Sequence, residues 1–96
     1  MAKVVICGYA RSAFTPAKKG KLNLTRPDDL AAQVVKGLIQ KTKIKEEDIE
    51  DLILGCAFPE AEQGMNLARN VVFLAGLPHT VGGVTVNRFC ASSMQA

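Results

Sequence analysis

The sequence contains no tryptophan, a single histidine and three cysteines, and it has no long apolar run. The longest runs, such as residues 71–77, fall far short of the roughly 20 residues that a membrane-spanning helix needs. The amino terminus has no apolar segment of the signal-peptide kind, so we expect a cytoplasmic protein without a membrane span. The cysteines are odd in number and form no C-x-x-C motif, which argues against a disulfide framework and against a bound metal.

The excess of one sign of charge is also small, because 12 basic and 9 acidic residues give a formal net charge of +3. No basic face interleaved with aromatic residues is present, and the lysines at 41, 43 and 45 are followed by acidic residues over 46–51, so we expect no nucleic-acid partner. The hydrophobic fraction of 48% and the charged fraction of 22% are typical of an ordinary globular chain. Low-complexity tracts and internal repeats are absent, so we expect one domain.

The apolar patterning predicts strands and helices in alternation. Strands are expected over residues 3–9, 51–56 and 81–87. A long helix should begin near Pro27, where Thr25 and Asp28 have the spacing of a capping box, and a second should cover about 66–75. An acidic turn is expected over 45–50, and a third helix should follow the last strand. This order predicts an α/β fold built from βαβ units, with a mostly parallel sheet and helices packed against it.

One cysteine lies where the last strand should become a helix. Cys90 follows the strand-like segment 84–86 and precedes residues that favour a helix. A helix start offers unpaired N–H groups and a partial positive charge, which favour a thiolate and can stabilise an oxyanion. Several unrelated enzyme families share this arrangement, so the residues alone identify a candidate nucleophile. A non-catalytic domain in which Cys90 is packed in the core stays open as an alternative.

The other candidate residues have simpler interpretations. Cys7 and Cys56 lie in or beside apolar strand-like runs, so we expect both to be packing residues. His79 lies between Pro78 and Thr80 in a predicted loop, and a loop histidine is more often exposed than catalytic. We therefore do not expect His79 to be the base that partners Cys90.

Three segments together resemble one family. V-T-V-N-R-F-C-A-S-S-M-Q-A over residues 84–96 closely resembles the reactive-cysteine segment of thiolases. The R-S-A-F turn at 11–14 and the segment Q-G-M-N-L-A-R-N at 63–70 resemble other parts of the same family. The resemblance implies a thiolase-like fold in which Cys90 is the nucleophile that forms an acyl-thioester intermediate. It also implies that Asn87 and Ala91, with Cys90 itself, shape the turn and the oxyanion site.

The R-F-C-A-S-S-M-Q variant is most similar to degradative 3-ketoacyl-CoA thiolases, of the acetyl-CoA C-acyltransferase type. The resemblance implies thiolytic cleavage of 3-ketoacyl-CoA in fatty acid β-oxidation, with acyl-CoA and coenzyme A as substrates and no permanently bound cofactor or metal. It further implies a homodimer or homotetramer. Three alternatives stay open: a biosynthetic acetoacetyl-CoA thiolase, a ketoacyl synthase-like condensing enzyme, and a non-catalytic domain that binds acyl-CoA or a partner chain.

Thiolases are several times longer than these 96 residues. The resemblance implies a second cysteine in a C-x-G motif, a histidine in a G-H-P motif and an N-E-A-F segment, and none of these occurs in the sequence. We therefore expect residues 1–96 to be the amino-terminal part of a thiolase N-terminal domain, and we expect this part to be inactive alone.

Overall fold

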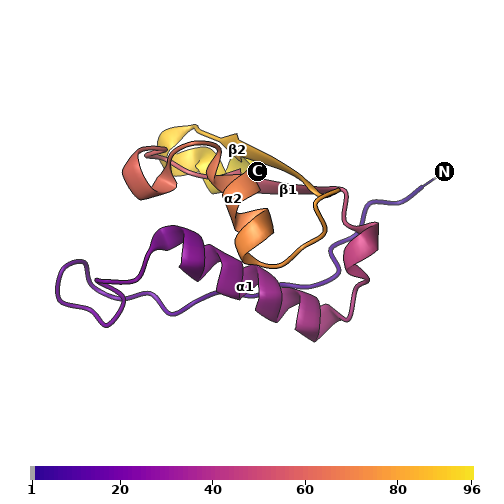
Figure 1. The fold of residues 1–96 in the computed structure, drawn as a ribbon, viewed down its shortest axis with the longest axis horizontal. Helices are drawn as coiled ribbons and strands as arrows, with labels where there is room; N and C mark the ends of the chain where they lie inside the picture. Colours follow the sequence, from indigo (N-terminus) through magenta and orange to yellow (C-terminus); the bar gives the residue numbers. More distant parts are fainter. Residues whose placement is uncertain (1) are drawn as a thin grey trace.

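The computed structural model describes residues 2–96, and its elements alternate between helix and strand (Figure 1). In chain order the helices and strands are α1 (Pro27–Thr42), β1 (Asp51–Gly55), α2 (Leu67–Leu74), β2 (Gly82–Val86) and α3 (Ser92–Gln95). Short 3-10 turns cover Glu46–Asp48, Ala61–Gln63 and Phe89–Ala91. Among the described residues, no helix is both long enough and apolar enough to cross a membrane.

The two strands form a parallel sheet, as the sequence predicts. Asp51 pairs with Gly82 at one end of the register, and Gly55 pairs with Val86 at the other. The N–H of Cys56 extends the pairing by donating to the carbonyl of Val86 at 3.0 Å. Because α2 connects the parallel strands, β1, α2 and β2 form one βαβ unit. The carboxyl ends of both strands therefore lie at the same edge of the sheet.

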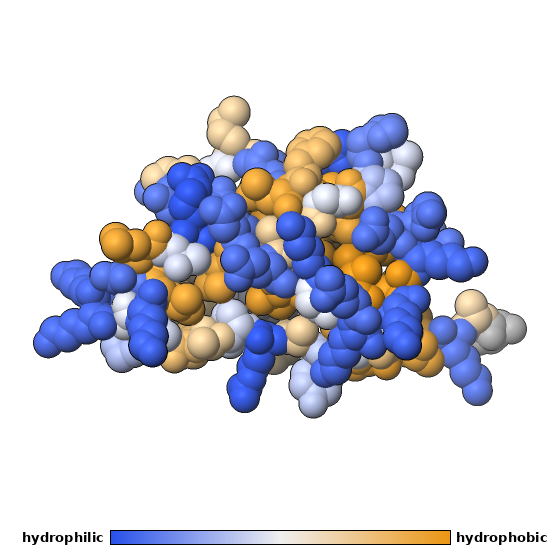
Figure 2. Space-filling model, turned by 60° about the horizontal axis from the view of Figure 1, so that its bottom comes forward, coloured by the Kyte–Doolittle hydropathy of each residue, from blue (hydrophilic) through white to orange (hydrophobic). Residues whose placement is uncertain are grey.

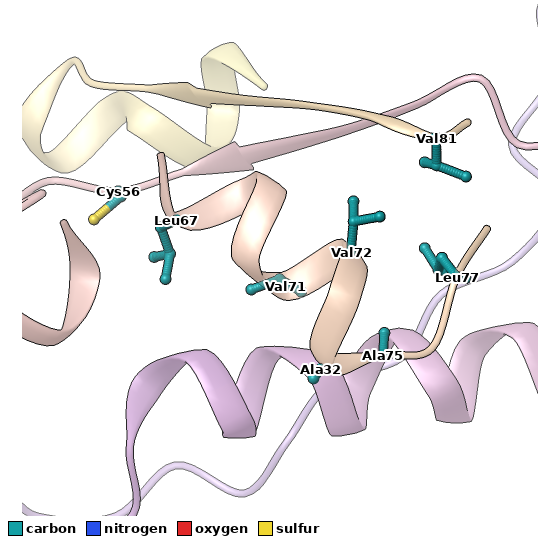
Figure 3. Packing of buried hydrophobic residues seen from close by; sticks show 8 residues of the cluster. All are labelled: Ala32, Cys56, Leu67, Val71, Val72, Ala75, Leu77 and Val81. Atoms are coloured by element: carbon teal, nitrogen blue, oxygen red, sulfur yellow. The ribbon is translucent and has the colours of Figure 1, made fainter. Parts of the chain in front are cut away.

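The core lies on α2, which is packed between the sheet and α1 (Figures 1 and 3). Val71 and Val72 of α2 and Val81 just before β2 are fully buried. Val72 lies near Val81, while Ala32 contributes the buried apolar position of α1 (Figure 3). Burying each valine side chain stabilises the fold by roughly 1.5–3 kcal/mol. The βαβ unit is therefore held together mainly by one apolar helix.

The start of α1 differs from the prediction in its capping. Pro27 does occupy the first turn, but the N-cap is Arg26 and no side chain caps the helix, so the capping box of Thr25 is wrong. Asp28 instead accepts hydrogen bonds from the Arg26 guanidinium at 2.9 and 3.1 Å and from the N–H of Asp29 at 2.8 Å. The Arg26 hydrogen bond is the main reason that the pKa of Asp28 lies below its usual value. Asp28, within the first turn, therefore accepts one of the free backbone N–H groups, which is the role that the prediction gave to Thr25.

The predicted strand over residues 3–9 is wrong, because this segment is irregular. It pairs with no strand among the described residues, and Val4 and Ile6 are 101% and 94% exposed. The segment instead runs beside the end of α1, where the Lys41 ammonium donates to the carbonyl of Tyr9 at 3.1 Å. An apolar alternation forms a strand only where a partner backbone satisfies its N–H and C=O groups.

The remaining predicted elements agree with the structure within one or two residues. The strands expected over 51–56 and 81–87 are β1 and β2, and the helix expected over 66–75 is α2. The acidic turn appears as Glu46–Asp48. Figure 2 shows the molecule with the α1 side turned forward, and hydrophilic side chains lie there beside hydrophobic patches. This mixture fits a helix with one apolar stripe directed inward and one charged side.

Candidate active site

Cys90 lies in the chain just after β2. Residues 87 and 88 leave the strand, Phe89–Ala91 form a 3-10 turn, and α3 begins at Ser92. The order of strand, turn and helix agrees with the prediction, but the α-helix begins two residues after the cysteine. Cys90 is exposed, so its thiol is accessible in the described chain.

Hydrogen bonds on both sides of Cys90 define the turn. The Asn87 carboxamide oxygen accepts from the N–H of Phe89 at 2.9 Å. The Ser92 hydroxyl accepts from the N–H of Arg88 at 2.9 Å and donates to the carbonyl of Phe89 at 2.6 Å. The turn is therefore held by one side chain that precedes the cysteine and one that follows it.

The amides of the turn are almost all used. Those of residues 88 and 89 bond to side chains, and the N–H of Ala91 donates to the carbonyl of Arg88 at 3.0 Å. The N–H of Ser92 donates to the carbonyl of Phe89. Within residues 2–96, no atom accepts a hydrogen bond from the N–H of Cys90. The donor nearest the thiol is thus free for a ligand.

Phe89 has an unusual backbone conformation. Its φ is 47°, in the left-handed region that a bulky residue rarely adopts. Such a conformation costs on the order of 1–3 kcal/mol and persists only where the surroundings enforce it. Here the enforcing contacts come from Asn87 and Ser92. The sequence gives no local signal for this feature, because glycine would be the expected residue at a positive φ.

Gly55, at the end of β1, lies against the backbone of Ser92 and Ser93, and it was not among the site residues predicted from the sequence. A Cβ on Gly55 would lie 2.4 Å from the backbone nitrogen of Ser93 and 2.6 Å from the carbonyl carbon of Ser92. Only a residue without a side chain therefore lets α3 lie directly on the end of β1. A glycine that ends an apolar strand run was the available signal, since glycine in a strand often marks a close backbone approach.

The end of β2 is anchored to the start of α2. Thr85 donates its hydroxyl to the carboxamide oxygen of Asn66 at 2.8 Å and accepts from the N–H of Ala68 at 3.0 Å. The Asn66 carboxamide also donates to the carbonyl of Gly83 at 3.0 Å. A groove of about 360 Å³ is lined by Asn66, Thr85 and Asn87, among others. This network holds the strand two residues before the turn begins.

The structure separates His79 from the turn. His79 is exposed and precedes β2, whereas Cys90 follows it, so the length of the five-residue strand, roughly 16 Å, separates them. Cys56 is buried, as expected, but Cys7 is exposed, so the prediction that Cys7 packs in the core is wrong. Its segment forms no strand and covers no sheet face. In the described part of the chain, no group of three or more acidic, histidine or cysteine side chains could hold a metal ion.

Comparison with known proteins identifies the family. The model of the thiolase N-terminal domain matches residues 4–96, and the chain belongs to the thiolase family. It is 52% identical over 96 residues to a 3-ketoacyl-CoA thiolase of Bacillus subtilis, with 100% of this chain and 25% of that protein covered. It is 50% identical over 93 residues to a 3-ketoacyl-CoA thiolase of Acinetobacter baumannii strain ATCC 17978, with 97% and 24% covered. An Acinetobacter baylyi protein of the same name is 48% identical over 93 residues, with the same coverage of 97% and 24%.

The chain therefore spans about a quarter of the length of the curated relatives that it matches. Its α/β fold, with a parallel sheet and packed helices, is consistent with a thiolase N-terminal domain. The expected membership of the thiolase family and the expected fold class are thus both confirmed.

Proposed function

We propose that this chain is the nucleophile-bearing amino-terminal part of a 3-ketoacyl-CoA thiolase, with Cys90 as the nucleophile. The observation that carries the proposal is the turn itself, in which an exposed thiol lies beside its own unpartnered N–H. The names and identities of the relatives support the choice of substrate class. The other catalytic groups of the proposed enzyme would correspond to the three quarters of those relatives that the chain does not span.

The proposed reaction has two steps. In the first, the Cys90 thiolate attacks the 3-keto carbon of a 3-ketoacyl-CoA, and its sulfur–carbon bond forms as the carbonyl becomes an oxyanion. Collapse of the oxyanion breaks the bond between C2 and C3, and the departing carbanion takes a proton to become acetyl-CoA. In the second step, the thiolate of free coenzyme A attacks the acyl-cysteine and releases a shortened acyl-CoA together with the Cys90 thiolate.

The residues of this chain serve the first bond-forming event. The N–H of Cys90 donates to the oxyanion, and Asn87 and Ala91 shape the turn around it. The α-helix that follows has four residues, so the free amide and not a long helix dipole is the main electrostatic contribution of the turn. The acid and the base for proton transfer belong to the histidine and second-cysteine motifs that the family resemblance implies. The part of the enzyme formed by residues 1–96 is therefore inactive alone, and the complete enzyme acts as a homodimer or homotetramer.

An alternative in which Cys90 only fills the core lacks support, because its side chain is exposed in the described chain. No contact of the described residues favours a biosynthetic thiolase or a condensing enzyme over the degradative reaction.

The test uses the complete polypeptide and compares two exposed cysteines. Cys90→Ser should lower kcat for thiolysis by at least about a thousandfold, whereas Cys7→Ser should leave it within about twofold. Mass spectrometry of enzyme quenched during turnover should show an acyl adduct on Cys90. Since both thiols are exposed, a difference in kcat between the two variants reflects the chemical role of the thiol and not its accessibility to solvent. Equal losses from the two substitutions, or an adduct elsewhere, would refute the assignment.

A further inference from the structure

We infer that Ser92 is a positioning residue of this site, whose buried hydroxyl aims the N–H of Cys90 toward the substrate. The inference rests on the proposed function, because it concerns how the nucleophile and its oxyanion donor are held together. The sequence places Ser92 two residues after the cysteine. Its hydrogen-bond partners are local, whereas its burial is a feature of the tertiary structure.

The contacts of Ser92 span the cysteine. Its hydroxyl accepts from the N–H of Arg88 and donates to the carbonyl of Phe89, at 2.9 and 2.6 Å. Ser92 is 3% exposed, so solvent does not replace these bonds when they are lost. The neighbouring Ser93 is exposed, and its hydroxyl makes no hydrogen bond with the described residues. The two serines therefore differ in burial and bonding although they are adjacent.

The carbonyl that Ser92 holds belongs to the same peptide group as the N–H of Cys90. A trans peptide is planar, and its C=O and N–H point in opposite directions. The Phe89 carbonyl receives both the hydroxyl and the backbone N–H of Ser92, so it points toward α3. The N–H of Cys90 consequently points away from α3, where it stays free of protein acceptors. Hydrogen bonds to the carbonyl also polarise the peptide group and strengthen its N–H as a donor.

The same bonds explain how Phe89 keeps its left-handed conformation. The Ser92 hydroxyl accepts from the N–H of Arg88, the residue before Phe89, and donates to the carbonyl of Phe89 itself, so it links backbone groups that lie on either side of the Phe89 φ rotation. Rotation of Phe89 to a common backbone conformation would break these bonds. Without the Ser92 hydroxyl we expect Phe89 to leave its φ of 47° and to turn the N–H of Cys90 out of place.

The experiment measures steady-state thiolysis by the complete polypeptide with matched serine variants. Ser92→Ala should lower kcat by about tenfold to a hundredfold with KM within about twofold, because the oxyanion donor acts mainly in the transition state. Ser93→Ala should retain kcat within about twofold. Ser92→Thr keeps the hydroxyl and should recover most of the lost kcat. Rates are normalised to the folded fraction of each variant, measured by circular dichroism, so that unfolded protein does not count.

Three results would overturn the inference: an unchanged kcat for Ser92→Ala, equal losses for both alanine variants, or a loss that appears in KM alone. If Ser92→Ala does not fold, the comparison moves to Ser92→Cys, which keeps the volume but is a weak hydrogen-bond partner. A lower kcat for Ser92→Cys than for Ser92→Thr supports the inference, and equal values overturn it. Cys90→Ser in the same assay separates the two proposals, since an active Cys90→Ser variant refutes the proposed function itself.

Discussion

A methyl group added at Gly55 should disturb both the stability of the fold and the turn at Cys90. The ideal Cβ at this position would lie 2.4 Å from the nitrogen and 2.6 Å from the Cα of Ser93. Ordinary van der Waals contacts begin near 3.4 Å, so α3 must move by about 1 Å for Gly55→Ala to be accommodated. The atoms in the way are backbone atoms, so a rotation of a side chain cannot relieve the overlap.

The expected magnitude follows from this displacement. Overpacking of this kind costs about 1–3 kcal/mol in the free energy of unfolding. A misplacement of about 1 Å in a catalytic turn lowers turnover by on the order of a hundredfold. Gly55→Ala should therefore lower both the melting temperature and kcat of the complete enzyme, although residue 55 lies on a different strand from the one that leads to Cys90.

Gly37 provides the matched control. It lies within α1, and a Cβ there would meet nothing within 4 Å. Gly37→Ala should leave kcat unchanged and stabilise the protein by about 0.5–1 kcal/mol, since alanine is the better helix former. Thermal unfolding and thiolysis measured on both variants decide the matter. A Gly55→Ala enzyme with the melting temperature and kcat of the parent would show that α3 does not rest on the end of β1 as described.

Two further predictions concern polar contacts away from the cysteine. Arg26 lowers the pKa of Asp28 below its usual 3.8, so this stabilisation is complete above about pH 4 and is lost as the pH falls through the folded-state pKa. In denaturant unfolding, Asp28→Asn should destabilise at pH 6 more than at pH 3, and an equal loss of stability at the two pH values would contradict this. Thr85→Val should cost about 1–3 kcal/mol, because the amide of the fully buried Ala68 loses its acceptor. Unchanged urea unfolding for this variant would rule out that contact.

The elements with a strong local pattern could be predicted from the sequence. The stripe that contains Leu30, Val34 and Leu38 has the helical period, and the short apolar run at 51–56 has the length of a buried strand. Both patterns act within a few residues, and both elements form where expected. The prediction for residues 3–9 failed although its pattern was equally apolar, because a strand depends on a partner that its own residues do not specify.

The candidate site divides in the same way. The position of a cysteine between a strand-like segment and residues that favour a helix was enough to single out Cys90, and the resemblance to thiolases was carried by contiguous motifs. The contact that lets α3 lie against the sheet was not visible, because it depends on where a distant segment lies. Gly55 is 35 positions from the cysteine in the sequence, yet its missing side chain lets α3 approach the sheet.

By itself, the sequence determined which segments could become helices or strands and which thiol stands at their junction, since these properties arise from periodicity and from neighbouring residues. Only the tertiary structure decided that Cys7 is exposed, that Ser92 is buried and that the N–H of Cys90 has no protein acceptor. The physical reason is that burial and hydrogen-bond satisfaction depend on packing between elements. A residue becomes buried only when the helices and strands that cover it have packed together.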